Sequence, residues 1–214
     1  MLDLWLKEVC KRVKIIMRIK PSAIFFDLDG VLVDSLDAWW IALNYALESF
    51  SHAAISRNEF IKRYWGHDLN DNLRRIGLSS DVGIFCNDFY SRNLDAVRIY
   101  PDTRDTLQKL GSYRKVVITN TPKNCAFQIL KRFDIEKYFD LIITSDDVKR
   151  GKPSPEIVFK ACAALDVSPK DVVLVGDTDS DVRAGKAAGC MVVGIHIKAD
   201  ITIHRLSELI RILE

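Results

Sequence analysis

The chain has 214 residues, which is long enough for one domain with a large buried core and an insertion, or for two small domains. Apolar residues make up 48% and charged residues 28% of it, a balance that argues against a disordered or membrane-embedded protein. The formal net charge of +2 gives no reason to expect a nucleic-acid partner, and five dispersed cysteines without a C-x-x-C pair favour a reducing, cytoplasmic compartment.

Residues 1–20 form a basic N-terminal extension, with six Lys or Arg against two acidic residues. Apolar residues recur near helical spacing, as in a helix that lies on an anionic membrane surface, at Leu2, Trp5, Val9, Val13 and Ile16. We favour simpler alternatives, an extra helix packed on the protein or on a partner, or initiation at Met17, because charge patterns have low specificity. Charged residues interrupt the apolar stretch that a secretory signal would need. No apolar run reaches the roughly 18 residues of a membrane span.

A buried strand is predicted at A-I-F-F-D-L, residues 23–28. The stretch F-F-D-L-D-G-V-L-V-D-S, residues 25–35, crowds three carboxylates together at its end, those of Asp27, Asp29 and Asp34. Beyond the end of the strand the chain turns, and Gly30 lets the backbone curl there. We therefore expect Asp27 and Asp29 to face one cleft.

Residues 36–97 are predicted to form an inserted helical module, the cap. The patterns at 36–50 and 82–90 repeat apolar residues every three and four positions, which is typical of amphipathic helices. The predicted exits of the cap are Asp34-Ser35 and the turn Tyr100-Pro101-Asp102, where proline keeps the preceding residue extended.

From residue 102 onward, short β-rich runs alternate with helical patterns. The runs are V-V-I-T at 116–119, L-I-I-T at 141–144, V-V-L-V-G at 172–176 and M-V-V-G-I at 191–195, and the helical patterns cover roughly 122–132, 154–165 and 179–189. This alternation predicts an α/β fold, a Rossmann-like parallel sheet with helices on both faces, built from residues 21–35 and 98–214.

Polar residues gather at the predicted carboxyl ends of the strands, where parallel α/β sheets place their sites. They are Asp27, Asp29, Thr119, Asp177 and, in a loop before a helix, Lys152. Carboxylates packed this closely, with Asp181 nearby, would raise one another's pKa unless a cation neutralised them. A site rich in oxygen without a nearby His or Cys favours Mg²⁺.

Four segments resemble, in order, the motifs of the haloacid dehalogenase-like hydrolases: D-L-D-G-V-L-V-D-S, V-I-T-N-T-P, G-K-P-S-P and V-G-D-T-D-S-D-V-R-A-G-K-A-A-G. The chain looks most similar to the branch of phosphoglycolate phosphatases and related small-molecule phosphatases. Residues 23–34 and 101–196 carry the resemblance, residues 35–97 match a small helical cap in size and helicity, and residues 1–20 lie outside it. The resemblance implies a phosphatase that acts on a small phosphorylated metabolite.

The resemblance also implies roles for individual residues. Asp27 would be the nucleophile that forms an aspartyl-phosphate, and Asp29 the general acid and base. Mg²⁺ would be held by Asp27, the backbone carbonyl of Asp29 and Asp177, with Asp181 holding a metal water or orienting its neighbours.

The same resemblance implies that Thr119, the backbone N–H of Asn120, and Lys152 hold the phosphate. In the segment Y-W-G-H-D-L-N, residues 64–70, Trp65 and His67 are candidates for substrate contact. The family commonly shows Pro-Gly where this chain has Pro101-Asp102, which puts the flexibility of that exit in question.

Alternatives to a phosphatase stay open at this point. A phosphomutase would share the Asp27 chemistry but return the phosphoryl group to a sugar hydroxyl. A receiver-type binding module also combines an Asp, a cation, a Thr and a Lys, and an inactive interaction scaffold could keep the fold, but Asp29 and the complete set of polar residues argue against both. The pattern leaves the oligomeric state open.

Overall fold

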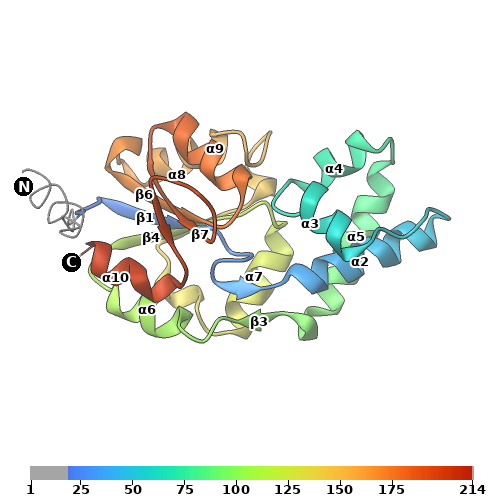
Figure 1. Cartoon of the computed structure of the whole chain (residues 1–214), viewed down its shortest axis with the longest axis horizontal. Helices are drawn as coiled ribbons and strands as arrows, with labels where there is room; N and C mark the ends of the chain where they lie inside the picture. Colours follow the sequence, from blue (N-terminus) through green and yellow to red (C-terminus); the bar gives the residue numbers. More distant parts are fainter. Residues whose placement is uncertain (1–18, 214) are drawn as a thin grey trace, which may run out of the picture.

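The structure is a computed structural model that describes residues 19–213. The predictions made for the first 18 residues of the basic extension therefore concern a segment outside the described residues. Two bodies lie side by side in Figure 1, a sheet domain and the smaller helical cap. None of the described helices is long and apolar enough to cross a membrane.

The sheet domain is built on one parallel sheet of six strands, in the order β5-β4-β1-β6-β7-β8. All neighbouring strands of this sheet pair in parallel. Their bounds, in sheet order, are Leu141–Ile143, Arg114–Ile118, Ala23–Phe26, Val172–Gly176, Met191–Ile195 and Ile201–Ile203. The predicted α/β fold with a Rossmann-like parallel sheet is confirmed.

The expected strands differ from the observed ones at several ends. Five strands were expected, and β8 was missed. β1 ends at Phe26, two residues earlier than predicted, because the chain turns at once: the Leu28 carbonyl accepts hydrogen bonds from the N–H groups of Leu32 and Val33, at 2.9 and 3.1 Å. β4 begins at Arg114 and ends at Ile118, so Thr119 lies one residue beyond it.

Helices cover both faces of the sheet. Helices α8 (Glu156–Leu165) and α9 (Asp179–Ala188) pack on one face, against buried strand residues such as Phe25 and Leu174 (Figure 1). The other face, with Phe26 and Val173, is covered by α6 (Thr103–Lys109), α7 (Lys123–Arg132) and α10 (Leu209–Leu213). Burial on both faces explains why these strands read as continuous apolar runs.

The cap lies at one end of the sheet and consists of four helices (Figure 1): α2 (Leu36–Ser49), α3 (Arg57–Arg63), α4 (Leu69–Arg75) and α5 (Ser80–Arg92). Its own aromatic core joins α2 to α5, where Trp39 stacks on Tyr90 with ring centroids 3.7 Å apart. The predicted helical insertion is thus confirmed.

The two connections to the cap are paired with each other. β2 (Val33–Asp34) and β3 (Arg98–Ile99) form an antiparallel two-stranded ribbon in which Val33 lies opposite Ile99. This pairing was not predicted. Asp102, where the family commonly has glycine, has φ −96°, so glycine is not required there, and its Oδ2 accepts a hydrogen bond from the Ser207 N–H at 2.9 Å.

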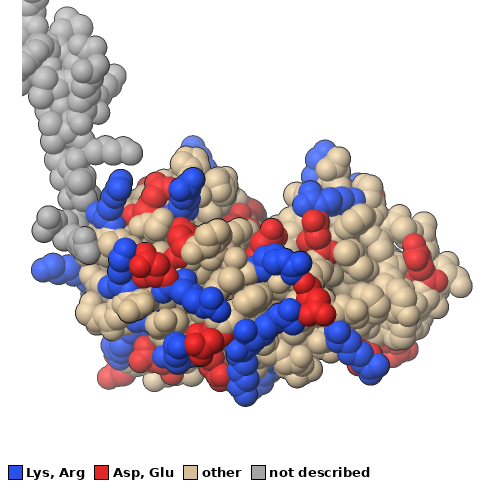
Figure 2. All heavy atoms as spheres, turned by 90° about the horizontal axis from the view of Figure 1, so that it is seen from below, with Lys and Arg blue, Asp and Glu red and all other residues tan. Residues whose placement is uncertain are grey.

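Charged side chains of both signs are intermingled on the face shown in Figure 2. Exposed ion pairs of the described residues include Lys109 with Asp105 at 2.8 Å and Arg132 with Asp95 at 2.7 Å. Exposed pairs of this kind contribute little to stability.

Candidate active site

The turn after β1 brings Asp27 and the loop of Asp177 together. Gly30 has φ +77°, and a Cβ on it would lie 2.1 Å from Asp177 Oδ2. Its N–H donates to the Val33 carbonyl at 2.8 Å, which closes the turn. A side chain at this position would be strained and would displace the carboxylate, so glycine is needed both for the turn and for the close approach of Asp177.

Lys152 is almost completely buried between two carboxylates. Its Nζ lies 2.7 Å from Asp27 Oδ1 and 2.6 Å from Asp181 Oδ1, and it also donates to the Ile118 carbonyl at 3.1 Å. Burial by itself would lower the pKa of Lys152, but the Asp181 and Asp27 carboxylates hold it above its usual value. The ammonium therefore stays charged and balances part of the negative charge around it.

Three carboxylates surround this single ammonium. Asp27, Asp177 and Asp181 each present an oxygen within 4.8 Å of the others. Burial, and then the neighbouring Asp181, raise the pKa of Asp27 well above its usual value, although Lys152 opposes the rise. Burial and Asp181 also raise the pKa of Asp177 to about 7. The site thus has a surplus of negative charge, as the sequence predicted.

The carboxylates differ in which of their oxygens already accept hydrogen bonds. Asp181 accepts from Lys152 at Oδ1, and at Oδ2 from the Thr178 hydroxyl at 2.6 Å and N–H at 3.1 Å. Asp177 Oδ1, in contrast, is buried and has no hydrogen-bond partner among residues 19–213. A buried, unpartnered carboxylate oxygen is costly. This oxygen-only donor set therefore fits a hard divalent cation of the Mg²⁺ type.

The Asp29 carboxylate is surrounded by hydroxyl and indole groups that donate hydrogen bonds to it. Its Oδ1 accepts from the Ser35 hydroxyl and, at 3.3 Å, from Trp39 Nε1, and its Oδ2 accepts from Thr121 Oγ1 at 2.5 Å and Thr119 Oγ1 at 3.4 Å. The sequence singled out only Thr119 among these four donors. Thr121 could have been found from its place two residues after Thr119, since both follow the end of β4.

Asn120 acts through its side chain in this structure. Its Oδ1 accepts from the Lys152 N–H at 2.8 Å, and its Nδ2 donates to the Lys152 carbonyl at 2.9 Å and to the Gly66 carbonyl of the cap at 3.2 Å. The sequence pointed to the backbone N–H of Asn120 instead. The side chain fixes the Lys152 loop and joins it to the cap.

The cap loop around Trp65 and His67 lies directly on the carboxylate cluster. Trp65 Nε1 donates to Asp177 Oδ2 at 3.2 Å, and His67 Nδ1 lies 3.3 Å from the Ser180 hydroxyl. Burial lowers the pKa of His67, which favours the neutral ring. Both cap residues that the sequence singled out therefore contact the sheet domain at the site.

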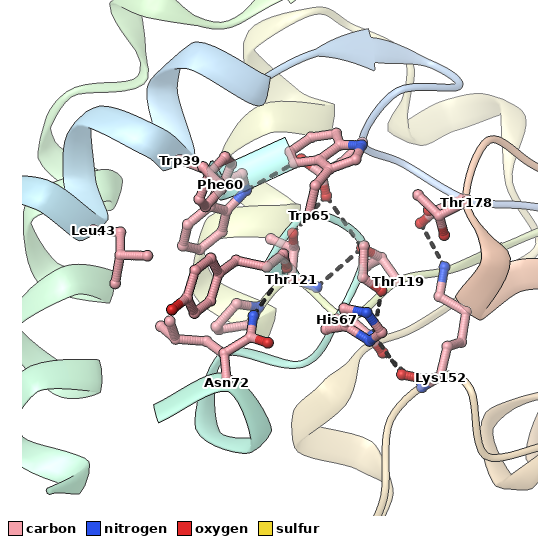
Figure 3. A pocket seen from close by; sticks show the side chains of 17 residues that line it. Trp39, Leu43, Phe60, Trp65, His67, Asn72, Thr119, Thr121, Lys152 and Thr178 are labelled. Carbon is pink, nitrogen blue, oxygen red and sulfur yellow. Dashed lines mark hydrogen bonds and ion pairs between the residues drawn. The ribbon is translucent and has the colours of Figure 1, made fainter. Parts of the chain in front are cut away.

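A cavity separates the cap from the sheet domain at this point. Figure 3 shows Trp39, Phe60 and Trp65 of the cap on one side, with Thr119 and Lys152 on the other. Its volume is about 60 Å³, whereas an apolar cavity that takes up benzene has roughly 150 Å³. An organic phosphate would therefore need the cap to move away before it could enter.

Comparisons with known proteins found a matching family model and similar proteins. A family model described as haloacid dehalogenase-like hydrolase matches residues 24–195. A phosphorylated carbohydrates phosphatase of Thermotoga maritima is 31% identical over 178 residues, covering 78% of this chain and 82% of that protein. A phosphoglycolate phosphatase of Aquifex aeolicus is 28% identical, covering 89% of this chain and 96% of that protein.

Among solved structures, the fold is similar to that of CbbY from Rhodobacter sphaeroides in complex with phosphate. The TM-score is 0.80 and the identity 22%, covering 88% of this chain and 96% of the other. At this identity the similarity concerns the fold, including the helical insertion beside a parallel sheet.

Proposed function

Because the chain belongs to the haloacid dehalogenase-like hydrolases, we propose that it is a Mg²⁺-dependent phosphatase that hydrolyses a small phosphorylated metabolite through an aspartyl-phosphate. The observation that carries the proposal is the buried cluster of Asp27, Asp177 and Asp181 around Lys152, with one Asp177 oxygen left without a partner. The two relatives described above are named as phosphatases, which supports the same activity.

Asp27 and Asp177, together with the backbone carbonyl of Asp29, would hold the cation. When bound, Mg²⁺ neutralises the carboxylates and the phosphate and so makes the phosphorus accessible to an anionic nucleophile. Asp181 would not bind the cation directly, because both of its oxygens already accept hydrogen bonds from Lys152 and Thr178. Its role is to orient Lys152 and the start of α9.

Asp27 performs the first displacement. Its Oδ1 accepts hydrogen bonds from the Leu28 N–H and from Lys152, both at 2.7 Å, which fix the carboxylate, and its other oxygen would be the nucleophile. That oxygen forms a bond to phosphorus while the ester P–O bond breaks and its electron pair leaves on the substrate oxygen. The product of this step is an aspartyl-phosphate.

Asp29 transfers the protons. In its protonated form it gives a proton to the leaving oxygen, which departs as an alcohol. The resulting carboxylate then accepts a proton from water as the water oxygen attacks phosphorus, and the Asp27 oxygen–phosphorus bond breaks. Inorganic phosphate is released and both side chains return to their starting state. The four donors around Asp29 hold it in position for both steps.

The phosphate itself would be held by Lys152, Thr119 and Asn120. All three line the same cavity as Asp27. Lys152 offsets the negative charge that phosphate adds to the carboxylates, and Asn120 keeps the Lys152 loop in place through two hydrogen bonds of 2.8 and 2.9 Å. Such positioning and charge balance account for most of phosphoryl-transfer catalysis.

The test replaces Asp27 by an isosteric residue. Asp27→Asn should lower kcat on phosphate esters by several decades while thermal unfolding shows an intact fold, because the nucleophile is lost. Asp34→Asn is the matched control, since Asp34 lies in the same motif but is exposed on β2. Retention of more than about a tenth of wild-type activity in Asp27→Asn, barely 1.4 kcal/mol of barrier, would exclude the assignment.

The same assay separates the alternatives. Release of inorganic phosphate that stops with excess chelator and returns with Mg²⁺ supports the phosphatase. Transfer of phosphate to a second hydroxyl of a sugar phosphate, without release, would indicate a phosphomutase. Full activity in excess chelator would contradict the metal requirement.

A further inference from the structure

The cap side of the cavity is apolar and largely aromatic. It is formed by Trp39, Leu43, Phe60, Tyr64, Trp65 and Leu69. The phosphate side, in contrast, carries the carboxylates and Lys152 (Figure 3). The part of a substrate that extends away from its phosphate would therefore lie against apolar rings and side chains.

No Lys or Arg of the cap lines this cavity, within the residues that the structure describes. Lys152 is the one cation of its lining, and it is already engaged by Asp27 and Asp181. The six basic residues of the cap are all exposed on its surface: Arg57, Lys62, Arg63, Arg74, Arg75 and Arg92. A second anionic group on a substrate, such as a carboxylate, would be buried there without a counter-charge, which is costly.

Apart from the indoles, Asn72 is one of three described cap side chains with polar atoms that line the cavity, together with His67 and Tyr64. It is 4% exposed, lines the cavity, and donates through Nδ2 to the Tyr64 carbonyl at 2.9 Å. Its Oδ1 is buried without a partner among the described residues. Buried polar atoms nearly always have a partner, so an unpartnered acceptor beside a cavity indicates a donor on the ligand.

The indole N–H groups of the cap do not offer further polar contacts. Trp39 donates to Asp29, and Trp65 donates to Asp177. A sugar, with several hydroxyls, would meet mostly apolar side chains on this side of the cavity. Among the described residues, the polar side-chain atoms left on this wall are those of Asn72, the His67 ring and the Tyr64 hydroxyl.

We propose that the substrate is the phosphate monoester of an uncharged, largely apolar or aromatic alcohol, with one donor that Asn72 Oδ1 accepts. This inference rests on the phosphatase activity proposed above and deepens it by naming the class of the leaving group. It separates this chain from the relatives named for phosphoglycolate and for phosphorylated carbohydrates.

The test compares three esters of primary alcohols, so that the bond broken is of the same kind in each. With Mg²⁺ saturating, kcat/KM is measured for benzyl phosphate, phosphoglycolate and a hexose phosphate esterified at its primary hydroxyl. Benzyl phosphate should be preferred by about tenfold or more, the discrimination that a fitted apolar pocket supplies. Preference for phosphoglycolate or the hexose phosphate overturns the inference and leaves the phosphatase intact. Hydrolysis of none of them, nor of an activated aryl phosphate, would overturn both.

A cap variant tests the role of charge. Leu69→Arg adds a cation to the half-buried first residue of α4, and should raise kcat/KM for phosphoglycolate relative to benzyl phosphate by about tenfold. Arg75→Ala, on the same helix, is the matched control and should leave the ratio unchanged because Arg75 is exposed. An unchanged ratio in folded Leu69→Arg, or a selective loss of phosphoglycolate hydrolysis in Arg75→Ala, would contradict the inference.

The contact of Asn72 with the substrate is also tested through a ratio of kcat/KM values for two substrates. Wild type should prefer at least one hydroxybenzyl phosphate isomer over benzyl phosphate. In Asn72→Leu this preference should fall about fivefold, the effect of one neutral hydrogen bond. Thermal unfolding checks the fold, since Asn72 also bonds to Tyr64. Should the folded variant keep the wild-type ratio, Asn72 does not contact the substrate.

Discussion

Replacing Lys152 by Met removes the one cation from a buried carboxylate cluster. The Lys152 side chain is 1% exposed and the facing Asp27 and Asp181 side chains 7% and 0%, so water cannot take over its role. Once the ammonium is gone, the cluster must either keep an unpaired buried charge or bind a further proton.

The free energy needed to bind that proton sets how much stability the variant loses. At pH 7, protonating a carboxyl whose usual pKa is about 3.9 costs about 4 kcal/mol, and at pH 5 the same step costs about 1.5 kcal/mol. Unfolding free energies of domains are about 5–15 kcal/mol, so the variant should remain folded but lose much of its stability. Relative to wild type, the loss should shrink by about 1.4 kcal/mol for each pH unit of acidification.

The assay is urea unfolding followed by tryptophan fluorescence, without Mg²⁺, at several values between pH 5 and 7. Lys115→Met is the matched control, because Lys115 is also buried but donates to the carbonyls of Leu110 and Tyr113, at 2.8 and 2.7 Å. Loss of those bonds should cost about 1–3 kcal/mol at every pH. If the Lys152→Met loss is as independent of pH as that of Lys115→Met, the account of the cluster is wrong.

Two further predictions concern the cap loop and the metal-free site. Gly66→Ala should lower kcat/KM by about tenfold or more, because a Cβ would lie 2.5 Å from Thr178 Cγ2 and hold the loop away from the site. The control is Gly77→Ala, which should not lower kcat/KM, because Gly77 has a similar φ but a Cβ there would have nothing within 4 Å. Since the folded-state pKa of Asp177 is raised to about 7, while a carboxyl of this kind has a pKa of about 3.9 when unfolded, its ionisation should lower the stability of the metal-free protein progressively as the pH rises from about 4 to 7. Saturating Mg²⁺ should remove this fall, and thermal unfolding with and without Mg²⁺ checks it; a metal-free stability that rises from pH 5 to 8 would contradict it.

The strongly patterned parts of the chain were predictable because their signal is local. The runs at 172–176 and 191–195 match β6 and β7 in full, since each is apolar along its whole length and buried on both faces. β8 was missed because Ile201–Ile203 has three residues with an exposed Thr202 at its centre, too short for a periodic pattern. The β2–β3 pairing was missed for the same reason, as each strand has two residues.

Some residues of the candidate site could likewise be predicted from local motifs, whereas others could not. Asp27, Asp29, Lys152 and Asp177 follow strands or precede a helix in recognisable motifs, so their gathering at one sheet edge could be foreseen. The contact of Trp65 with Asp177 joins residues 112 positions apart in the chain, and depends on how the cap sits on the sheet domain. Asn72 lies in no recognisable motif, and its unpartnered Oδ1 appears only with its neighbours in place.

The paired ribbon of β2 and β3 has a consequence for how such enzymes diversify. Val33 lies opposite Ile99 and Asp34 opposite Arg98, so the cap leaves and rejoins the sheet domain at adjacent points. A reverse turn from Asp34 to Arg98 could in principle close that gap, and the six strands would keep their neighbours. The insertion can thus be exchanged, enlarged or redesigned while the strands that precede Asp27 and Asp177 keep their neighbours in the sheet.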